Sequence, residues 1–349
     1  MIIIKPKLNL APLIFAVCIG ALLFSFPESA LNGAKSGVEI CLKTLIPSLF
    51  PVMALSTFIL RTNALYLPCR ALRKVTKFLF CLPENAGQII FMALIGGYPV
   101  GLKMVSDSVK SGEITENEAK RLSMFCMNAG PAFTVTALGV GIYGNELIGI
   151  VIFISLCIST LLIGIFTRFF SDGKSKSERK SKPPRFSGDE ITYSVWNAFQ
   201  SMLKISAWVI LFGAITACIT EKLGNVGQIL SSVLEVTGGT VTASKIYPVP
   251  VVTALTGFGG FCVHCQVLSF LRDSNLQYKK FLAGRLVNSA LSAVICHLIL
   301  YFFPIDQSVA YTFESARVSA ISVSAPTVVA FFFMCMTFIF SIDRKEKMC

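Results

Sequence analysis

The sequence predicts an all-α polytopic membrane protein, built from two inverted repeats that contain re-entrant helical hairpins and discontinuous helices. Composition predicts the membrane class: 54% of the 349 residues are hydrophobic and only 14% are charged. A soluble domain of this size needs far more charge to cover its surface, whereas several apolar runs here approach the ~20 residues that cross a bilayer. Glycine and proline inside those runs, together with an internal repeat, predict the hairpins and the broken helices.

The net charge of +12 could indicate either a nucleic-acid surface or a membrane topology signal. The basic residues fall in short connections between apolar runs, as the positive-inside rule describes for cytoplasmic loops. We therefore expect a lipid bilayer as a partner and no nucleic acid. The twelve Cys residues are scattered, mostly within apolar runs where Cys behaves as a small hydrophobe, so no disulfide framework is expected.

The chain begins with an expected span at 8–26, retained rather than cleaved as a signal peptide, and a loop completes an N-terminal segment 1–37. The next run, 38–60, contains two prolines, which predict a kink or a pair of half-helices. A stretch at 61–77 has basic residues without an acid, which indicates an interfacial cytoplasmic helix, with an anion site as the alternative.

The segment 91–131 organises the rest of the chain, because two apolar runs within it are interrupted. Gly and Pro disfavour continuous helix, and inside lipid the freed backbone groups need protein or water around them. We expect a re-entrant hairpin at 87–105, with a full span as the alternative. A discontinuous helix should follow, and a capping box at Thr115 and Glu118 marks its start. Many secondary transporters expose backbone dipoles to a substrate in this way. The interrupting residues are Gly96, Gly97, Pro99 and Gly101, then Asn128, Gly130 and Pro131.

A basic cytoplasmic linker is expected at 171–194, between a first repeat at 38–170 and a second repeat at 195–342. A charged tail, 343–349, follows the second repeat. Further apolar runs are expected at 147–170, 195–219, 249–271, 281–303 and 321–342.

The two repeats match at an offset of about 161 residues, which pairs Gly96 with Gly257 and Lys43 with Lys204. Counting spans from a cytoplasmic N-terminus orients them oppositely, as inverted repeats. The same count places the tail outside, so a topology with a full span in place of one hairpin stays open.

Five polar residues could act on a substrate, and each has a plainer interpretation. Lys103 could bind a carboxylate or extend to the membrane surface. Asn128 could lie beside carbonyls that coordinate a cation or substrate, or it could cap a helix. Glu235 could serve a coupling ion or proton, or lie in an exposed loop. Gln266 and Asn288 are the analogous groups of the second repeat.

No catalytic signature of the HExxH, GxSxG or P-loop type occurs in the chain, so we expect neither an enzyme nor a cofactor. Cys262 and Cys265 flank His264 in a CxxC pattern, which could hold a metal or pack inside a hairpin. No second ligand pair lies nearby, and we expect no metal. His297, within an apolar run, is expected to be a buried, hydrogen-bonded side chain.

Four motifs in order resemble a known family: Gly96-Gly97-Tyr98-Pro99-Val100-Gly101, Asn128-Ala129-Gly130-Pro131, Glu235-Val236-Thr237-Gly238-Gly239 and Gly257-Phe258-Gly259-Gly260-Phe261. Over roughly 38–300, this set resembles the sporulation integral membrane proteins with nucleoside-recognition (Gate) domains, which are distantly similar to concentrative nucleoside transporters. The resemblance implies two Gate-like repeats and a substrate site made of hairpins and unwound helices. It also implies a location in the outer forespore membrane of an endospore-forming bacterium.

The resemblance and the polar candidates together predict the substrate-binding residues. They are Gly96, Gly97, Tyr98, Pro99, Gly101, Lys103, Asn128, Gly130, Pro131, Glu235, Gly257, Gly259, Gly260, His264, Gln266 and Asn288.

The expected function is transport of a small anionic aromatic metabolite, with dipicolinic acid implied by the resemblance, during endospore formation. A coupling ion, Na+ or H+, would drive it, and the chain is compatible with an oligomer. One alternative is a membrane scaffold for maturation of the spore envelope, and another is a nucleoside-type transporter.

Overall fold

The structure is a computed structural model that describes residues 11–62, 64, 73–83, 85–170, 188–274 and 276–305. Within these residues every regular element is a helix. The described residues do not include the expected span at 321–342, the tail 343–349 or the linker up to residue 187. Most of the basic stretch 61–77 also lies outside them, although the last part of that stretch forms the start of α5 (Arg73–Phe80).

Four segments of the described chain are long and apolar enough to cross a membrane. They are α9 (Glu146–Thr167), α10 (Gly188–Leu223), the run Val249–Leu268 and α15 (Tyr278–Phe302). A fifth span is formed if α1 (Ala11–Ser25) and α2 (Pro27–Ile40) count as one, although they bend by 101°. The protein is therefore an all-helical integral membrane protein, as its composition predicts.

Residues 27–37 are helical, so the prediction of a loop there was wrong. They belong to α2, which continues through a π-helical turn (Cys41–Leu45) into α3 (Ile46–Thr62). Helix packing explains the difference, because Gly33 and Gly37 face α10 so closely that a Cβ on Gly33 would collide with the Gly213 carbonyl. The π turn comes just before Pro47, where a proline ring would otherwise clash with the carbonyl four residues earlier.

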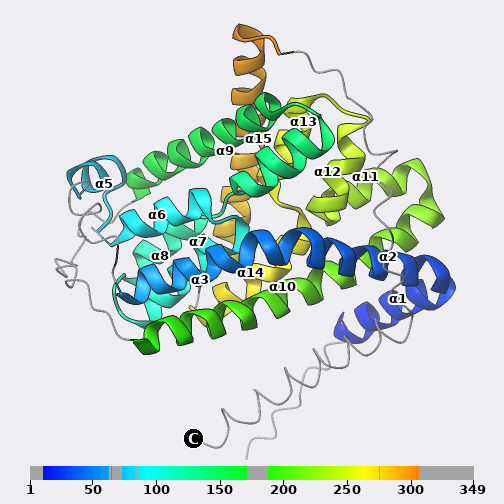
Figure 1. The fold of residues 1–349 in the computed structure, drawn as a ribbon, viewed down its shortest axis with the longest axis horizontal. Helices are drawn as coiled ribbons and strands as arrows, with labels where there is room; N and C mark the ends of the chain where they lie inside the picture. Colours follow the sequence, from blue (N-terminus) through cyan, green and yellow to red (C-terminus); the bar gives the residue numbers. More distant parts are fainter. Residues whose placement is uncertain are drawn as a thin grey trace, which may run out of the picture.

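The helix α10 also begins earlier than expected, at Gly188 inside the predicted linker. Asp189 and Glu190 occupy its first turn, where negative charge complements the positive end of the helix dipole. Figure 1 shows α2 and α3 lying along α10, whereas α15 runs across them. Elements of the two predicted repeats therefore pack together: α10 on α2 and α3, α14 on α7, and α15 on α8 and α9.

The expected interruptions at Gly96–Gly97, at Asn128–Pro131 and at Gly259 lie between separate helices. Pro99 and Gly101 were also expected to interrupt the chain, but they lie inside the first turns of α7, where proline is tolerated. Gly96 and Gly97 separate α6 (Ala86–Ile95) from α7 (Tyr98–Lys110), and residues 126–131 separate α8 (Glu116–Phe125) from the π-helix η2 (Ala132–Ile142). Gly259 separates α13 (Val249–Phe258) from α14 (Gly260–Asp273). The predicted capping box at Thr115 and Glu118 is present. Two short helices were not predicted, α11 (Asn225–Leu234) and α12 (Val236–Ser244), which meet at Glu235.

Candidate functional site

The four chain interruptions meet in the core. Gly130 contacts the first interruption so closely that a Cβ there would lie 2.7 Å from the Ile95 carbonyl oxygen and 3.0 Å from the Gly97 nitrogen. A Cβ on Gly259 would lie 3.3 Å from the Tyr98 ring, and one on Gly260 would lie 2.9 Å from the Val236 nitrogen. Segments that are far apart in the sequence therefore form one junction, with backbone packed against backbone.

Two of these glycines are required by backbone conformation as well as by space. Gly97 has φ of 86° and Gly259 has φ of 88°, values that a side chain would strain. These angles end α6 and α13 and allow α7 and α14 to begin within one or two residues. The glycine patterns found in the sequence therefore mark the turns that bring the helix ends together.

A cavity of about 150 Å³ opens at this junction. The starts of three helices line it: α7 through Tyr98 and Pro99, η2 through Pro131 and Ala132, and α12 through Val236 and Thr237. Apolar side chains of α3, α10 and α14 complete the wall. Eight predicted substrate-binding residues line this cavity, namely Gly96, Gly97, Tyr98, Pro99, Gly130, Pro131, Glu235 and Gln266.

The polar groups of the cavity wall are few. Glu235 is 6% exposed, so it does not lie in an exposed loop. Its carboxylate caps α12 by accepting N–H bonds from Thr237 at 2.8 Å and Gly238 at 2.5 Å. The starts of α7 and η2, in contrast, have no side-chain cap. Because helix N-termini carry partial positive charge, these two ends favour a negative group in the cavity.

Side chains also cap the C-terminal end of α13, where the interruption at Gly259 removes the helical partners of the last carbonyls. The Tyr98 hydroxyl donates to the Thr256 carbonyl at 2.7 Å, and the Asn288 amide donates to Gly257 at 3.3 Å. His264 Nε2 lies 3.1 Å from the Phe258 carbonyl and acts as the donor there. The predicted residues Gly257, Gly259, Gly260, His264 and Asn288 thus build the interruption rather than the cavity wall.

Arg285, on α15, was not among the predicted site residues. Its guanidinium donates to the Gly257 carbonyl at the end of α13 and to the Met127 carbonyl just after α8. The residue is fully buried, and the described part of the chain offers it no ion pair. The sequence signal was an arginine within an apolar helix, which is costly in a membrane and usually functional.

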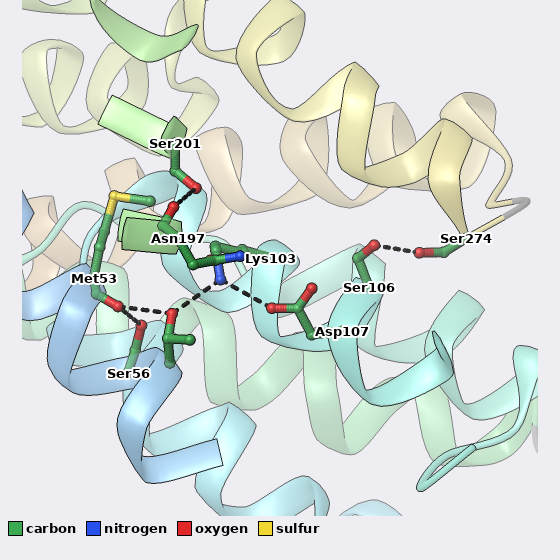
Figure 2. A network of polar contacts seen from close by, with 9 residues as sticks. Met53, Ser56, Lys103, Ser106, Asp107, Asn197, Ser201 and Ser274 are labelled. Atoms are coloured by element: carbon green, nitrogen blue, oxygen red, sulfur yellow. Dashed lines mark hydrogen bonds and ion pairs between the residues drawn. The ribbon is translucent and has the colours of Figure 1, made fainter. Parts of the chain in front are cut away.

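Lys103 lies about one helical turn beyond Pro99 of the cavity wall, in a separate polar network (Figure 2). Lys103 is 3% exposed. Its ammonium donates to the Thr57 hydroxyl at 3.0 Å and pairs with the Asp107 carboxylate at 2.9 Å. It therefore neither extends to the surface nor lines the cavity. The neighbouring Gly101 packs directly against the Cys126 carbonyl.

Asn128 lies fully buried in the second interruption, but it does not line the cavity and caps no helix. Its amide nitrogen lies 3.7 Å from the Cys157 sulfur of α9, and its oxygen has no hydrogen-bond partner.

The CxxC pattern packs internally, with the Gln266 amide donating to Cys262 at 3.4 Å. No group of three potential metal ligands occurs in the described residues.

Comparison with known proteins gives one informative similarity. The chain is 22% identical over 334 residues to the sporulation integral membrane protein YlbJ of Bacillus subtilis (strain 168), covering 82% of this chain and 81% of that protein. No family model matches the chain. No solved structure matches it either.

Proposed function

We propose that the protein is a secondary transporter that moves a small anionic ring compound, with dipicolinate as the first candidate, across a membrane during endospore formation. The observation that carries the proposal is the cavity at the junction of four interrupted segments, two from each predicted repeat. The name of the Bacillus relative supports a membrane role in sporulation, with the outer forespore membrane as the proposed location.

The size and lining of the cavity support a single-ring ligand. Cavities of roughly 150 Å³ can hold a benzene ring, and the cavity here has about that volume. Mostly apolar walls with a few placed polar groups are typical of small-molecule sites. The uncapped starts of α7 and η2 supply partial positive charge for a carboxylate. Since Asp107 pairs with Lys103 outside the cavity, helix ends take the role first expected of that lysine.

Alternating access would come from movement of the two repeats against each other. The pair α6–α7 and the pair α13–α14 each break at glycine about 161 residues apart, which supports the proposed inverted repeats. In this proposal α6–α7 is a re-entrant hairpin, whereas α13–α14, which is long and apolar enough to cross a membrane, is a broken span. Because the cavity wall includes residues from both repeats, a small rotation between them would open it to one side of the membrane or the other.

The test is ligand binding to the purified protein, measured as a thermal shift with dipicolinate and with uridine as the neutral control. A ligand at a hundredfold excess over its Kd stabilises the folded state by about 2.7 kcal/mol. A shift with dipicolinate alone is expected. A shift with uridine alone would favour a nucleoside-type transporter. Absence of any shift, together with absence of uptake into vesicles, would favour the scaffold alternative.

Variants at a residue of the cavity wall test whether the ligand binds in this cavity. Val209 on α10 lines the cavity and is 3% exposed, so Val209→Phe should weaken dipicolinate binding by more than tenfold. Val195→Phe adds the same side chain to the same helix at a position 45% exposed, and it should leave binding unchanged. Val209→Ala, which enlarges the cavity without overpacking, checks that the first effect is occlusion rather than misfolding. Equal affinities in all three variants would contradict this location.

A further inference from the structure

Glu235 is the acidic side chain in the cavity wall. The described residues provide no ion pair for it, and the cavity lining contains no basic side chain. Both carboxylate oxygens accept an N–H bond from the first turn of α12, which fixes the group at the cavity. A fixed acid in an anion site requires a physical explanation.

The charged and titratable groups around Glu235 do not neutralise it. Tyr98 of α7 and Cys262 of α14 are near enough to interact with its charge, and both are neutral in their ordinary state. Arg285 of α15, a fully buried cation, donates to the carbonyls of Met127 and Gly257 rather than to the carboxylate. The lining residues contributed by the π turn and α3, by α10, and by the start of η2 are apolar. They are Leu45, Leu49, Val52, Ile205, Val209, Pro131, Ala132 and Phe133.

An anionic ligand in this cavity would therefore meet an ionised carboxylate without a cation between them. Two like charges about 4 Å apart, with the screening typical of protein sites, weaken binding on the order of a thousandfold. A proton on Glu235 removes the repulsion. It also turns one oxygen into a hydroxyl that can donate a hydrogen bond to the ligand carboxylate.

We propose that Glu235 is the proton-coupling residue: it takes up a proton from the solvent when the anion enters and releases that proton when the anion leaves on the other side. The driving ion is then H+ rather than Na+. This inference rests on the proposed function, because it concerns the same cavity and the same ligand. Proton and ligand move together, so each ligand that enters brings one proton. That proton balances one of the two carboxylate charges of dipicolinate.

Proton uptake during binding tests the proposal. Dipicolinate is titrated into purified protein in weak buffer with a pH indicator at pH 7 to 8, where free carboxylates are ionised. We expect the wild type to take up about one proton per bound ligand. Its affinity should fall tenfold for each pH unit above the point at which Glu235 ionises, as linkage requires of one coupled proton. Sodium should not change the affinity.

Three variants separate this role from a structural one. Glu235→Gln keeps an oxygen that can cap α12, and its binding should lose both the pH dependence and the proton uptake. Glu235→Asp should keep the uptake. Glu221→Gln changes an exposed acid on α10 and should behave as wild type.

The outcomes distinguish the inference from the proposed function. Proton uptake that persists in Glu235→Gln, or wild-type binding without uptake, overturns the coupling role and leaves the transport proposal in place. Binding that requires sodium also overturns it. If the wild type binds no anion at any pH, the proposed function fails and this inference fails with it.

Discussion

Arg285 is a buried cation whose hydrogen-bond partners are carbonyls rather than a carboxylate. Met127 follows the end of α8, and Gly257 lies in the last turn of α13, so both carbonyls lie at C-terminal helix ends. Each such end carries about half a negative charge. Two ends together therefore balance roughly one guanidinium, and a single side chain joins two interrupted helices.

Replacement of Arg285 should destabilise the protein strongly. Arg285→Leu leaves the two buried carbonyls without a donor, and each costs about 1–3 kcal/mol. We expect a loss of about 3 kcal/mol in the free energy of unfolding, measured by denaturation in detergent, with partial recovery in Arg285→Lys. The control is Arg168→Leu, since Arg168 donates to the Phe78 carbonyl at an exposed position. Equal losses in the two Leu variants would refute the bridging role.

At the scale of elements, the contact between α2 and α10 replaces a predicted loop. The predicted loop before residue 38 contains Gly33 and Gly37, and glycine has low helix propensity. In the structure, they are the positions at which the two backbones approach, so packing outweighs propensity. Small residues serve this purpose in many membrane helix pairs, where close van der Waals contact drives association.

This contact can be tested by adding side chains to two faces of α2. Gly33→Val places methyl groups against the Gly213 carbonyl, and α2 and α10 must separate to accept them. We expect a thermal unfolding midpoint several degrees lower in detergent, as for overpacking that costs about 1–3 kcal/mol. Ser36→Val adds a similar side chain on the exposed face of the same helix and should have little effect. Tolerance of Gly33→Val would show that the helices do not approach so closely.

The interruptions could be predicted from the sequence because glycine and proline determine local conformation directly. Gly97, Gly130 and Gly259 were identified for this reason, and all three lie at the junction. The helix α12 could not be predicted in the same way, since its sequence, rich in Gly, Thr and Val, has low helix propensity and the structure stabilises it by the Glu235 cap and by packing.

Side-chain partners were harder to predict than backbone turns. For Lys103 the sequence predicted either a bound carboxylate or a position at the membrane surface, whereas the structure pairs it with Asp107, four residues along the same helix. For Asn288 and His264, the sequence placed polar groups near glycine turns without showing which carbonyls they would cap. Such partners depend on contacts between segments more than a hundred residues apart, as between Tyr98 and Thr256.

At the scale of the whole molecule, the two predicted repeats supply one another's missing hydrogen bonds. Arg285 of the second repeat caps the Met127 carbonyl of the first, and Tyr98 of the first caps the Thr256 carbonyl of the second. Ser159 of α9 donates to the Asn288 side chain at 2.7 Å. Neither repeat alone satisfies its buried polar groups, which is costly within a membrane.

The chain should therefore tolerate a cut between the repeats but not the loss of either one. If residues 1–179 and 180–349 are expressed as two chains, we expect them to co-purify and to bind dipicolinate as the intact protein does, since the contacts between repeats are retained without the covalent connection. Each fragment expressed alone should be degraded or aggregate, because its interrupted helix ends then lack their caps. A pull-down through a tag on fragment 1–179 measures how strongly the two fragments bind each other. Arg285→Leu in fragment 180–349 is the matched control and should lower the amount recovered. Recovery of either fragment alone as a stable, folded protein would mean that the repeats fold independently and that the junction forms after each is complete.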